Sequence, residues 1–356
     1  MSSFENVEIF EDTKRLCETN GKIKDALARS VNNQKLIPEG TELSVVDKAR
    51  FTDEAKIVVS TKRTFEAAAG YAGQKVAVHN FASATNPGGG VTRGSSAQEE
   101  CLCRCSGLYF CLSVPEMMRG FYYPHRNTKN PINNADIIYT PDVTVFKTDT
   151  SRPKLMDEKD WYDVDVITCA APNLRERPSN RFNQGNGDRA VKVSDRELLE
   201  IHKKRLTRIL DVAALNGDEV VILGAFGCGA FQNKPEVVAR ANADVAKWQT
   251  RLAQTQLEQS IPVQVRSSVS VDLAQLVQHW SRKPAGEMVR REGSTPSVHA
   301  LGRHGGTGIH TCPRSKRESM WVRIPLTALR RFGGSLENCR PGDLGSWVQI
   351  PDSPLT

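Results

Sequence analysis

Hydrophobic positions along this chain follow two spacings, one typical of strands and one typical of helices. Short apolar runs predict buried strands at Lys56–Ser60, Lys75–Phe81, Asp163–Asn173 and Asp218–Leu223. Apolar residues at helical spacing predict helices at Thr61–Gly70, Glu99–Leu112 and Asp195–Ala214. Strands and helices that alternate in this way are typical of an α/β fold.

Weaker patterns predict the elements at the N-terminus. Residues 13–29 predict two helices with a break near Asn20 and Gly21. A turn at Pro38–Gly40 and a strand at Glu42–Val46 are expected to follow.

Two polar stretches predict loops. Tyr122–Asn134 is rich in proline, asparagine and charge, and Arg175–Gly187 is polar and rich in glycine. Such clusters between periodic segments are typical of irregular connections.

The most informative stretch joins the strand at Lys75–Phe81 to the helix that starts at Glu99. It contains the triple glycine Gly88–Gly90 and a further glycine at Gly94. Glycine permits positive φ and close backbone approach, and the free N–H groups of a helix start attract anions. Two carboxylates would repel a phosphate placed on them. We therefore expect phosphate on the glycines and acid–base chemistry at Glu99 and Glu100.

A simpler interpretation of the glutamates stays open. Ser96-Ala97-Gln98-Glu99 fits a capping box with Ser96 as the N-cap, so that Glu99 would only close the helix end. Glu100 would then be a solvated first-turn acid. The loop has neither the Gly-Lys-Ser/Thr of a Walker loop nor the Gly-x-Gly-x-x-Gly of a dinucleotide site. It therefore belongs to neither of these nucleotide-binding classes.

A second glycine-rich stretch follows the strand at Asp218–Leu223. Its loop carries several glycines, and Pro235 stands at a proline-tolerant first-turn position of the next helix. A glycine turn between a strand and a helix is common in α/β folds, so this pattern alone is weakly specific. Together with the first loop, it predicts two glycine segments at strand ends that can close over one diphosphate.

Composition narrows the class of protein. Hydrophobic residues make up 39% of the chain and charged residues 25%, which suits a soluble globular protein. No run of about 18 apolar residues predicts a membrane span, and no secretory signal is seen, so we expect a cytoplasmic or nuclear location. Cys101, Cys103 and Cys105 would point in different directions on a helix, which favours reduced buried thiols over a metal site.

The last third of the chain differs from the rest. Residues 243–356 hold 15 Lys/Arg against 9 Asp/Glu, and so carry most of the net charge of +7. They are rich in Arg, Gly, Pro and Ser and contain a near-repeat of Trp321–Thr327 at Trp347–Pro351. We expect a tail that is disordered or foreign to the preceding domain; a basic appendage that binds nucleic acid weakly is the alternative. Within it, Ile261–Val271 alternates well enough to add one strand to the sheet.

The first glycine loop carries a specific resemblance. Gly88-Gly89-Gly90, seven further residues and Gln98-Glu99-Glu100 resemble the signature of the microbial-type poly(ADP-ribose) glycohydrolases. The flanking residues Asn80–Ala84 and Leu102–Tyr109 fit as well. The resemblance extends over residues 13–242 and implies a macrodomain, a mixed α/β module that binds ADP-ribose.

The expected architecture is therefore an α/β macrodomain-like mixed sheet flanked by helices. Residues 1–40 are expected to form an N-terminal helical extension and residues 243–356 an irregular C-terminal tail. Between them, residues 41–242 are expected to form the catalytic domain, truncated at its C-terminus relative to the family. Ile137–Phe146 resembles a short strand pair of the family around a proline turn.

The resemblance also implies a role for each site residue. Glu100 would be the general acid and base, and Glu99 would orient the leaving ribose. Asn86 would hydrogen-bond the ribose next to the scissile bond, and Phe231 would pack against a ribose unless it is an ordinary core residue. The other expected substrate-binding residues are Gly88, Gly89, Gly90, Gln98, Gly227, Cys228, Gly229 and Ala230. Backbone N–H groups would hold the diphosphate, and no metal or other cofactor is expected.

The implied activity is hydrolysis of ribose–ribose O-glycosidic bonds in poly(ADP-ribose), with release of ADP-ribose. Two alternatives stay open: a macrodomain that binds ADP-ribose without turnover, and hydrolysis of a different ADP-ribosyl linkage. The expected partners are poly(ADP-ribose) or ADP-ribosylated proteins, with no membrane contact. The chain is expected to be a monomer.

Overall fold

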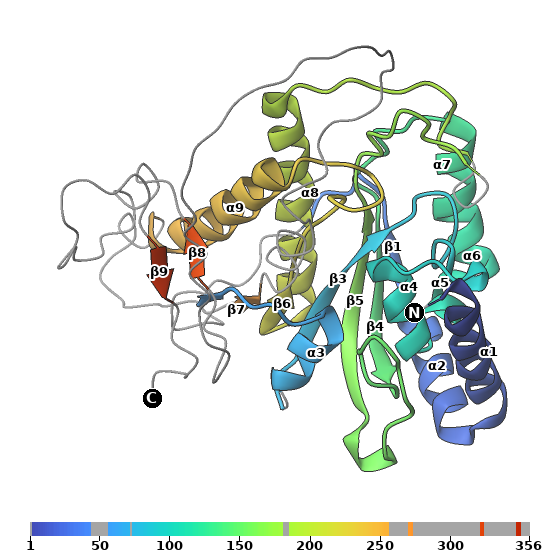
Figure 1. The fold of residues 1–356 in the computed structure, drawn as a ribbon. Coiled ribbons are helices and arrows are strands. Elements are labelled where there is room, and N and C mark those ends of the chain that lie inside the picture. Colours follow the sequence, from blue (N-terminus) through green and yellow to red (C-terminus); the bar gives the residue numbers. More distant parts are fainter. Residues whose placement is uncertain are drawn as a thin grey trace, which may run out of the picture. The chain divides into compact units, whose positions relative to one another are not determined.

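The computed structural model describes residues 2–43, 56–71, 73–180, 185–255, 270–272, 321–323 and 347–349. The chain divides into two compact units, Met1–Met288 and Val289–Thr356. The first unit holds a seven-stranded sheet with its helices (Figure 1). The second holds an antiparallel pair of short strands, β8 (Trp321–Arg323) and β9 (Trp347–Gln349).

The main sheet is mixed, with the strand order β1-β4-β5-β3-β6-β7-β2. Its strands are β1 (Lys35–Ile37), β2 (Ile57–Val58), β3 (Val76–Ala82), β4 (Ile137–Val145), β5 (Tyr162–Ala170), β6 (Val220–Ile222) and β7 (Ser270–Asp272). From β5 to β2 the neighbouring strands run parallel, whereas β4 runs antiparallel to both β1 and β5. The predicted α/β class with a mixed sheet is confirmed.

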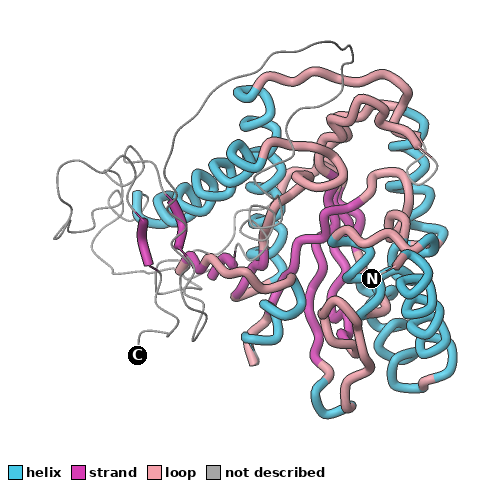
Figure 2. Tube along the Cα trace, in the orientation of Figure 1, coloured by secondary structure: helices cyan, strands magenta, loops and turns pink. Residues whose placement is uncertain are grey.

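Helices cover both faces of this sheet, and Figure 2 shows the strands between the two groups of helices. On one face α8 (Asp195–Asn216) and α9 (Pro235–Thr255) form a core cluster with β5 and β6. The other side is covered by α1 (Ser3–Thr19), α2 (Gly21–Asn33), α3 (Thr64–Ala68), α4 (Gln98–Cys105), α5 (Leu108–Leu112), α6 (Pro115–Met117) and α7 (Tyr123–Thr128). Because both faces are covered, β3 is almost entirely buried.

The two N-terminal helices confirm the predicted pair with a break at Asn20. Asn20 ends α1 and caps α2, since its Oδ1 accepts a hydrogen bond from Ile23 N (3.2 Å). The pair is longer than predicted, because α1 already begins at a capping box formed by Ser2 and Glu5.

The predicted helix over Glu99–Leu112 is two helices, α4 and α5. Ser106, the C-cap of α4, has an extended backbone and forms an isolated β-bridge with Val145. Its hydroxyl donates to Leu102 O (2.9 Å) and accepts from Leu108 N (3.3 Å), so backbone groups on both sides of the break are satisfied. The apolar periodicity continues across the break, which is why it predicted one helix.

The segment Tyr122–Asn134 is partly helical, so the loop prediction was wrong there. A π-helical turn (Met118–Tyr122) leads into α7, and Pro124 lies in the first turn of α7, where no N–H is required. The buried His125 ring bonds the carbonyl of Phe121 (2.7 Å). Tertiary packing therefore overrides the polar composition of this segment.

A single strand, β4, replaces the strand pair expected at Ile137–Phe146. Its register with β5 shifts between Thr140 and Val143, where Asp142 has a positive φ of 51°. The N–H of Asp142 donates to Asp165 Oδ1 (2.9 Å). The proline site is therefore a bulge within one strand.

Other predicted elements are described only in part. Strand β7 contains the last two residues of the strand predicted at Ile261–Val271 and lies between β6 and β2; residues 261–269 lie outside the described part of the chain. Of the strand predicted at Glu42–Val46, Glu42 and Leu43 form no strand, and residues 44–46 lie outside that part. Arg175–Gly187 forms no helix where it is described, and residues 181–184 are outside.

Helix α9 crosses residue 242, which the sequence indicated as the end of the catalytic domain. Val245 and Ala246, beyond that point, are buried, and Val245 belongs to the core cluster under α8 and α9. No helix within the described ranges combines the length and apolar character that a membrane span requires.

Candidate active site

A cavity of about 650 Å³ lies where β3 and β6 end and α4 begins. Its volume is within the range of roughly 300–1,000 Å³ that is typical of small-molecule sites. The lining residues are Arg63, Thr64, Phe81, Ser83, Gly89, Gly90, Ser95, Ser96, Ala97, Gln98, Glu99, Glu100, Cys101, Leu102, Asp149, Arg175, Asn180, Ala225, Gly227, Gly229, Ala230 and Phe231. Both glycine segments and both glutamates therefore meet at one cavity.

The first glycine segment is folded tightly against the glutamates. Gly88 and Gly89 have positive φ values of 64° and 60°. A Cβ on Gly89 would lie 2.5 Å from Glu100 Oε1, and a Cβ on Gly88 would lie 2.7 Å from the Tyr109 ring. Glycine is required there by both the backbone conformation and the space.

The N-terminal helix holds the far end of this segment. Asn6 Nδ2 donates to Gly94 O (2.9 Å), and Gly94 has a positive φ of 79°. A Cβ on Gly94 would lie 2.0 Å from Ser3 O, so α1 and the glycine segment meet through their backbones. Helix α1 is thus part of the scaffold of the site.

Glu100, in the first turn of α4, has one bonded and one unbonded carboxylate oxygen. Its Oε1 accepts a hydrogen bond from Gly90 N (2.9 Å), whereas Oε2 is buried and has no hydrogen-bond partner among the described residues. Burial raises the pKa of this carboxyl, and the Gly90 N–H opposes that shift. A carboxyl with a raised pKa and an unbonded oxygen is suited to carry a proton.

Glu99 uses both of its carboxylate oxygens. Oε2 accepts from Ser83 N (2.8 Å), and Oε1 accepts from Asn80 Nδ2 (3.4 Å). Burial, and then the neighbouring charge of Glu100, raise the pKa of the Glu99 carboxyl well above its usual range. Two adjacent buried carboxyls therefore favour a state that retains a proton.

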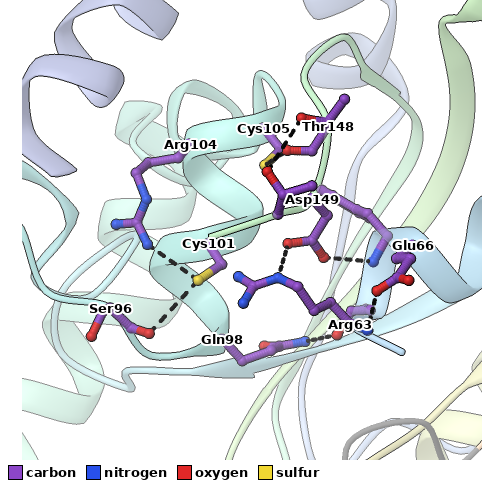
Figure 3. A network of polar contacts seen from close by, with 12 residues as sticks. Arg63, Glu66, Ser96, Gln98, Cys101, Arg104, Cys105, Thr148 and Asp149 are labelled. Carbon is purple, nitrogen blue, oxygen red and sulfur yellow. Dashed lines mark hydrogen bonds and ion pairs between the residues drawn. The ribbon is translucent and has the colours of Figure 1, made fainter. Parts of the chain in front are cut away.

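The capping box considered for Ser96 and Glu99 does not form. The N-cap of α4 is Ala97, which makes no side-chain cap, and Glu99 bonds Ser83 N instead of a helix-end N–H. The Ser96 carbonyl accepts from the Cys101 thiol (3.7 Å; Figure 3). Helix capping therefore does not account for the buried position of Glu99.

Gln98 connects α4 to β3 through its side-chain amide. Its Oε1 accepts from Phe81 N (2.9 Å), and its Nε2 donates to His79 O (2.7 Å) and to Thr64 Oγ1 (3.2 Å). These bonds satisfy backbone groups of β3 and fix the start of α4 against the sheet. Gln98 lines the cavity with its amide already bonded.

Three residues expected to bind substrate lie outside the lining of this cavity: Asn86, Gly88 and Cys228. Asn86 Oδ1 accepts from Arg126 Nη2 (3.3 Å), and its Nδ2 donates to Thr85 Oγ1 (3.1 Å). Cys228 is buried in the core cluster beneath α8 and α9.

The second glycine segment supplies four lining residues, Gly227, Gly229, Ala230 and Phe231. Gly227 has a positive φ of 77°, and a Cβ there would lie 2.5 Å from Ala171 Cβ. Asn233 ties this segment to the end of β5, because its Nδ2 donates to Pro172 O (2.6 Å) and to Gly227 O (3.1 Å). The segment is therefore held beside the cavity by buried bonds.

Sequence reasoning missed three charged residues of the cavity. Arg63 Nε forms an ion pair with Asp149 Oδ1 (2.6 Å; Figure 3), and the two residues are 86 positions apart, so no local motif links them. The Arg175 guanidinium lies over the Phe231 ring, 5.6 Å from its centroid. Arg175 lies two residues after the predicted strand end at Asn173, and that position was the signal that could have identified it.

Known proteins match this chain over most of the site. A family model of the microbial-type PARG catalytic domain matches residues 4–148. The Thermomonospora curvata poly(ADP-ribose) glycohydrolase, solved with the inhibitor ADP-HPD, is 28% identical with a TM-score of 0.54, over 76% of this chain and 93% of its own. Among curated proteins, no sequence matches.

The Deinococcus radiodurans enzyme gives similar values. Its complex with ADP-ribose is 28% identical with a TM-score of 0.54, over 69% of this chain and 90% of its own. A threonine-to-arginine mutant of that enzyme, also with ADP-ribose, is 30% identical with a TM-score of 0.52, over 69% and 90%. The residues matched by the family model include the triple glycine and both glutamates. The chain belongs to the microbial-type poly(ADP-ribose) glycohydrolases, a family of glycosidases.

Proposed function

We propose that this chain hydrolyses the ribose–ribose O-glycosidic bond of poly(ADP-ribose) and releases ADP-ribose, with Glu100 as the general acid and base. One observation carries the assignment: the buried Glu100 carboxyl is held on one oxygen by Gly90 N, and its other oxygen has no hydrogen-bond partner in the part of the chain that the structure describes. Related enzymes solved with ADP-ribose and with ADP-HPD support ADP-ribose as the ligand of the cavity.

The diphosphate of ADP-ribose would lie between the two glycine segments. On the first segment the N–H of Gly89 already donates to Asn86 O (3.0 Å) and that of Gly90 to Glu100 Oε1 (2.9 Å), so phosphate oxygens would share these donors. On the second segment the oxygens would accept from the N–H groups of Gly227, Gly229 and Ala230, which line the cavity. The positive φ values of Gly89 and Gly227 bring these backbones close to the cavity. Phe231 would pack against a ribose from the second segment.

The reaction begins with Glu100 protonated. Glu100 gives its proton to O2′ of the leaving adenosine while the bond from that oxygen to C1″ breaks, which leaves an oxocarbenium-like ribose. The Glu100 carboxylate then takes a proton from water as the water oxygen bonds to C1″. The products are ADP-ribose with a C1″ hydroxyl and a polymer end with a free 2′-hydroxyl, and Glu100 is protonated again.

Glu99 would orient the leaving ribose by accepting hydrogen bonds from its hydroxyls. Its bonds to Ser83 N and Asn80 Nδ2 fix the carboxylate in position. Asn86 stands beside the glycine segment with its amide bonded to Thr85 and Arg126. A contact between Asn86 and the ribose would require that side chain to turn.

Glu100→Gln tests the assignment. Glutamine keeps an oxygen for Gly90 N but cannot donate a carboxylic proton, so polymer hydrolysis should fall by at least about 10²-fold. Binding of ADP-ribose, measured by calorimetry, should persist. The exposed Glu116→Gln serves as the matched control and should keep parental turnover. A Glu100→Gln variant that degrades polymer at the parental rate would contradict the mechanism.

A parent chain that binds ADP-ribose but does not shorten labelled polymer would instead support the binding-module alternative. Both measurements use the full chain. They separate loss of chemistry from loss of binding, because calorimetry does not depend on turnover.

A further inference from the structure

One wall of the cavity has no part in the proposed function. Arg63, Asp149 and Cys101 line the cavity but belong to neither glycine segment. Cys101 directly follows Glu100 in the first turn of α4, so this wall adjoins the proposed general acid. Any group bound there would lie next to the scissile bond.

Asp149 holds the Arg63 side chain in place. The Asp149 carboxylate is 2% exposed, accepts from Arg63 Nε at 2.6 Å and accepts from Phe65 N at 3.0 Å. The Arg63 side chain is 21% exposed, and Figure 3 shows its terminal nitrogens turned away from Asp149, beside Cys101. A guanidinium fixed at Nε presents its other N–H groups as a planar fork of donors.

A second arginine, Arg104, contacts this wall from outside the cavity lining. Arg104 lies on the other side of the Cys101 sulfur, where its Nη2 donates to that sulfur (3.1 Å) and its Nη1 donates to Ser95 O (2.6 Å; Figure 3). Arg104 is 2% exposed, and no carboxylate of the described residues forms an ion pair with it. The Glu66 carboxylate accepts from Arg63 N (3.1 Å; Figure 3), so it lies near these charges as well. The cationic group that this wall presents to the cavity is the Arg63 guanidinium.

We infer that this wall is a second anion subsite, which binds the 5′-diphosphate of the poly(ADP-ribose) unit on the leaving side of the scissile bond. The inference rests on the proposed function. The polymer carries one diphosphate per unit, and the glycine segments would hold the diphosphate of the released unit. The adenosine on the leaving side of the scissile bond carries the next diphosphate, on the other side of Glu100. The parallel N–H groups of an arginine guanidinium can bind two phosphate oxygens at once.

The test measures binding to the full chain with Glu100→Gln, so that the polymer stays intact. The two ligands are ADP-ribose and an ADP-ribose dimer, which has one scissile bond and one leaving unit. The dimer should bind about tenfold more tightly than ADP-ribose, a difference of about 1.4 kcal/mol. Arg63→Gln in the same background should remove that preference and leave the Kd for ADP-ribose within about twofold.

Two further variants separate the subsite from a folding defect. Arg63→Gln leaves Asp149 buried without its cation, so the double variant Arg63→Gln/Asp149→Asn removes both charges and should lose the dimer preference as well. Arg240→Gln, at a side chain that is 70% exposed and away from the cavity lining, should keep it. Added salt should reduce the preference in the parent but not in the Arg63 variants.

The inference is overturned by a parent that binds both ligands equally, by a preference that survives in both Arg63 variants, or by equal losses for both ligands. If the parent binds neither ligand, the proposed function fails too. Binding of ADP-ribose without a dimer preference contradicts the leaving-side subsite alone. The two failures are therefore distinguishable.

Discussion

Lowering the pH from 7 to 5 should destabilise the fold by about 4 kcal/mol through two buried histidines. His79, on β3, is fully buried, packs against Phe226 at a centroid distance of 4.4 Å, and has no hydrogen-bond partner on either ring nitrogen among the described residues. His202, on α8, bonds Asn233 Oδ1 through Nε2 (2.9 Å). Burial lowers the pKa of His79 to about 3 and that of His202 to about 4.

The sign follows from these shifts. Both imidazoles stay neutral in the folded chain, whereas the unfolded chain takes up protons below a histidine pKa of about 6.5. The two neutral histidines therefore contribute fully to the free energy of unfolding above pH 6.5. This contribution is lost as the pH falls towards their pKa values in the folded chain. At pH 5, about 1.5 pH units below the unfolded pKa, each histidine lowers the free energy of unfolding by about 2 kcal/mol.

Glu99 and Glu100 act in the opposite direction, because their raised pKa values let the folded chain take up protons first as the pH falls. The total pH dependence is therefore a difference between two effects. A variant that removes a single histidine isolates one of them, since the glutamate contributions cancel between variant and parent.

His79→Leu provides that comparison in urea unfolding at pH 7 and pH 5. When the pH falls from 7 to 5, the free energy of unfolding of the variant should rise by about 2 kcal/mol relative to that of the parent. This change corresponds to a shift of roughly 1 M in the difference between their urea midpoints. Phe226→Leu, a substitution in the same cluster without a titratable group, should change stability equally at both pH values. An unchanged difference between His79→Leu and the parent would refute the reasoning.

Two predictions concern the scaffold of the glutamates. Gly89→Ala should lower polymer hydrolysis at least about tenfold and the free energy of unfolding by about 1–2 kcal/mol. The reason is that the new Cβ would lie 2.5 Å from Glu100 Oε1 at a residue with a positive φ. A variant with parental turnover would show that this segment can shift freely. Asn6→Ala removes the bond to Gly94 O and should lower the free energy of unfolding by about 1–2 kcal/mol in urea titrations. Asn33→Ala is its control, because Asn33 is exposed and its Nδ2 donates to Arg29 O (3.0 Å) within α2. Equal effects of the two substitutions would contradict a special role for Asn6.

The elements that the sequence predicted well depend on neighbouring residues. The strand, glycine segment and helix from Lys75 to Cys105 succeed one another along the chain, so their spacing already indicated the site. The second segment, from Gly227 to Phe231, was identified for the same reason. In both cases the backbone conformation depends on glycines that the sequence displays directly.

The parts that could not be predicted depend on contacts between distant positions. Arg63 and Asp149 pair across 86 residues, and Asn6 reaches Gly94 across 88. No local pattern records either contact. The break at Ser106 has the same origin, because the bridge to Val145 on β4 redirects a segment whose own periodicity is helical.

The contact of Asn6 and Ser3 with Gly94 has a practical consequence for how this enzyme is dissected. The sequence predicts residues 1–40 as an extension outside the catalytic domain, yet Ser3 and Asn6 in the first turns of α1 contact the first glycine segment at Gly94. A fragment that starts at residue 41 would remove these contacts and leave the carbonyl of Gly94 without its amide partner.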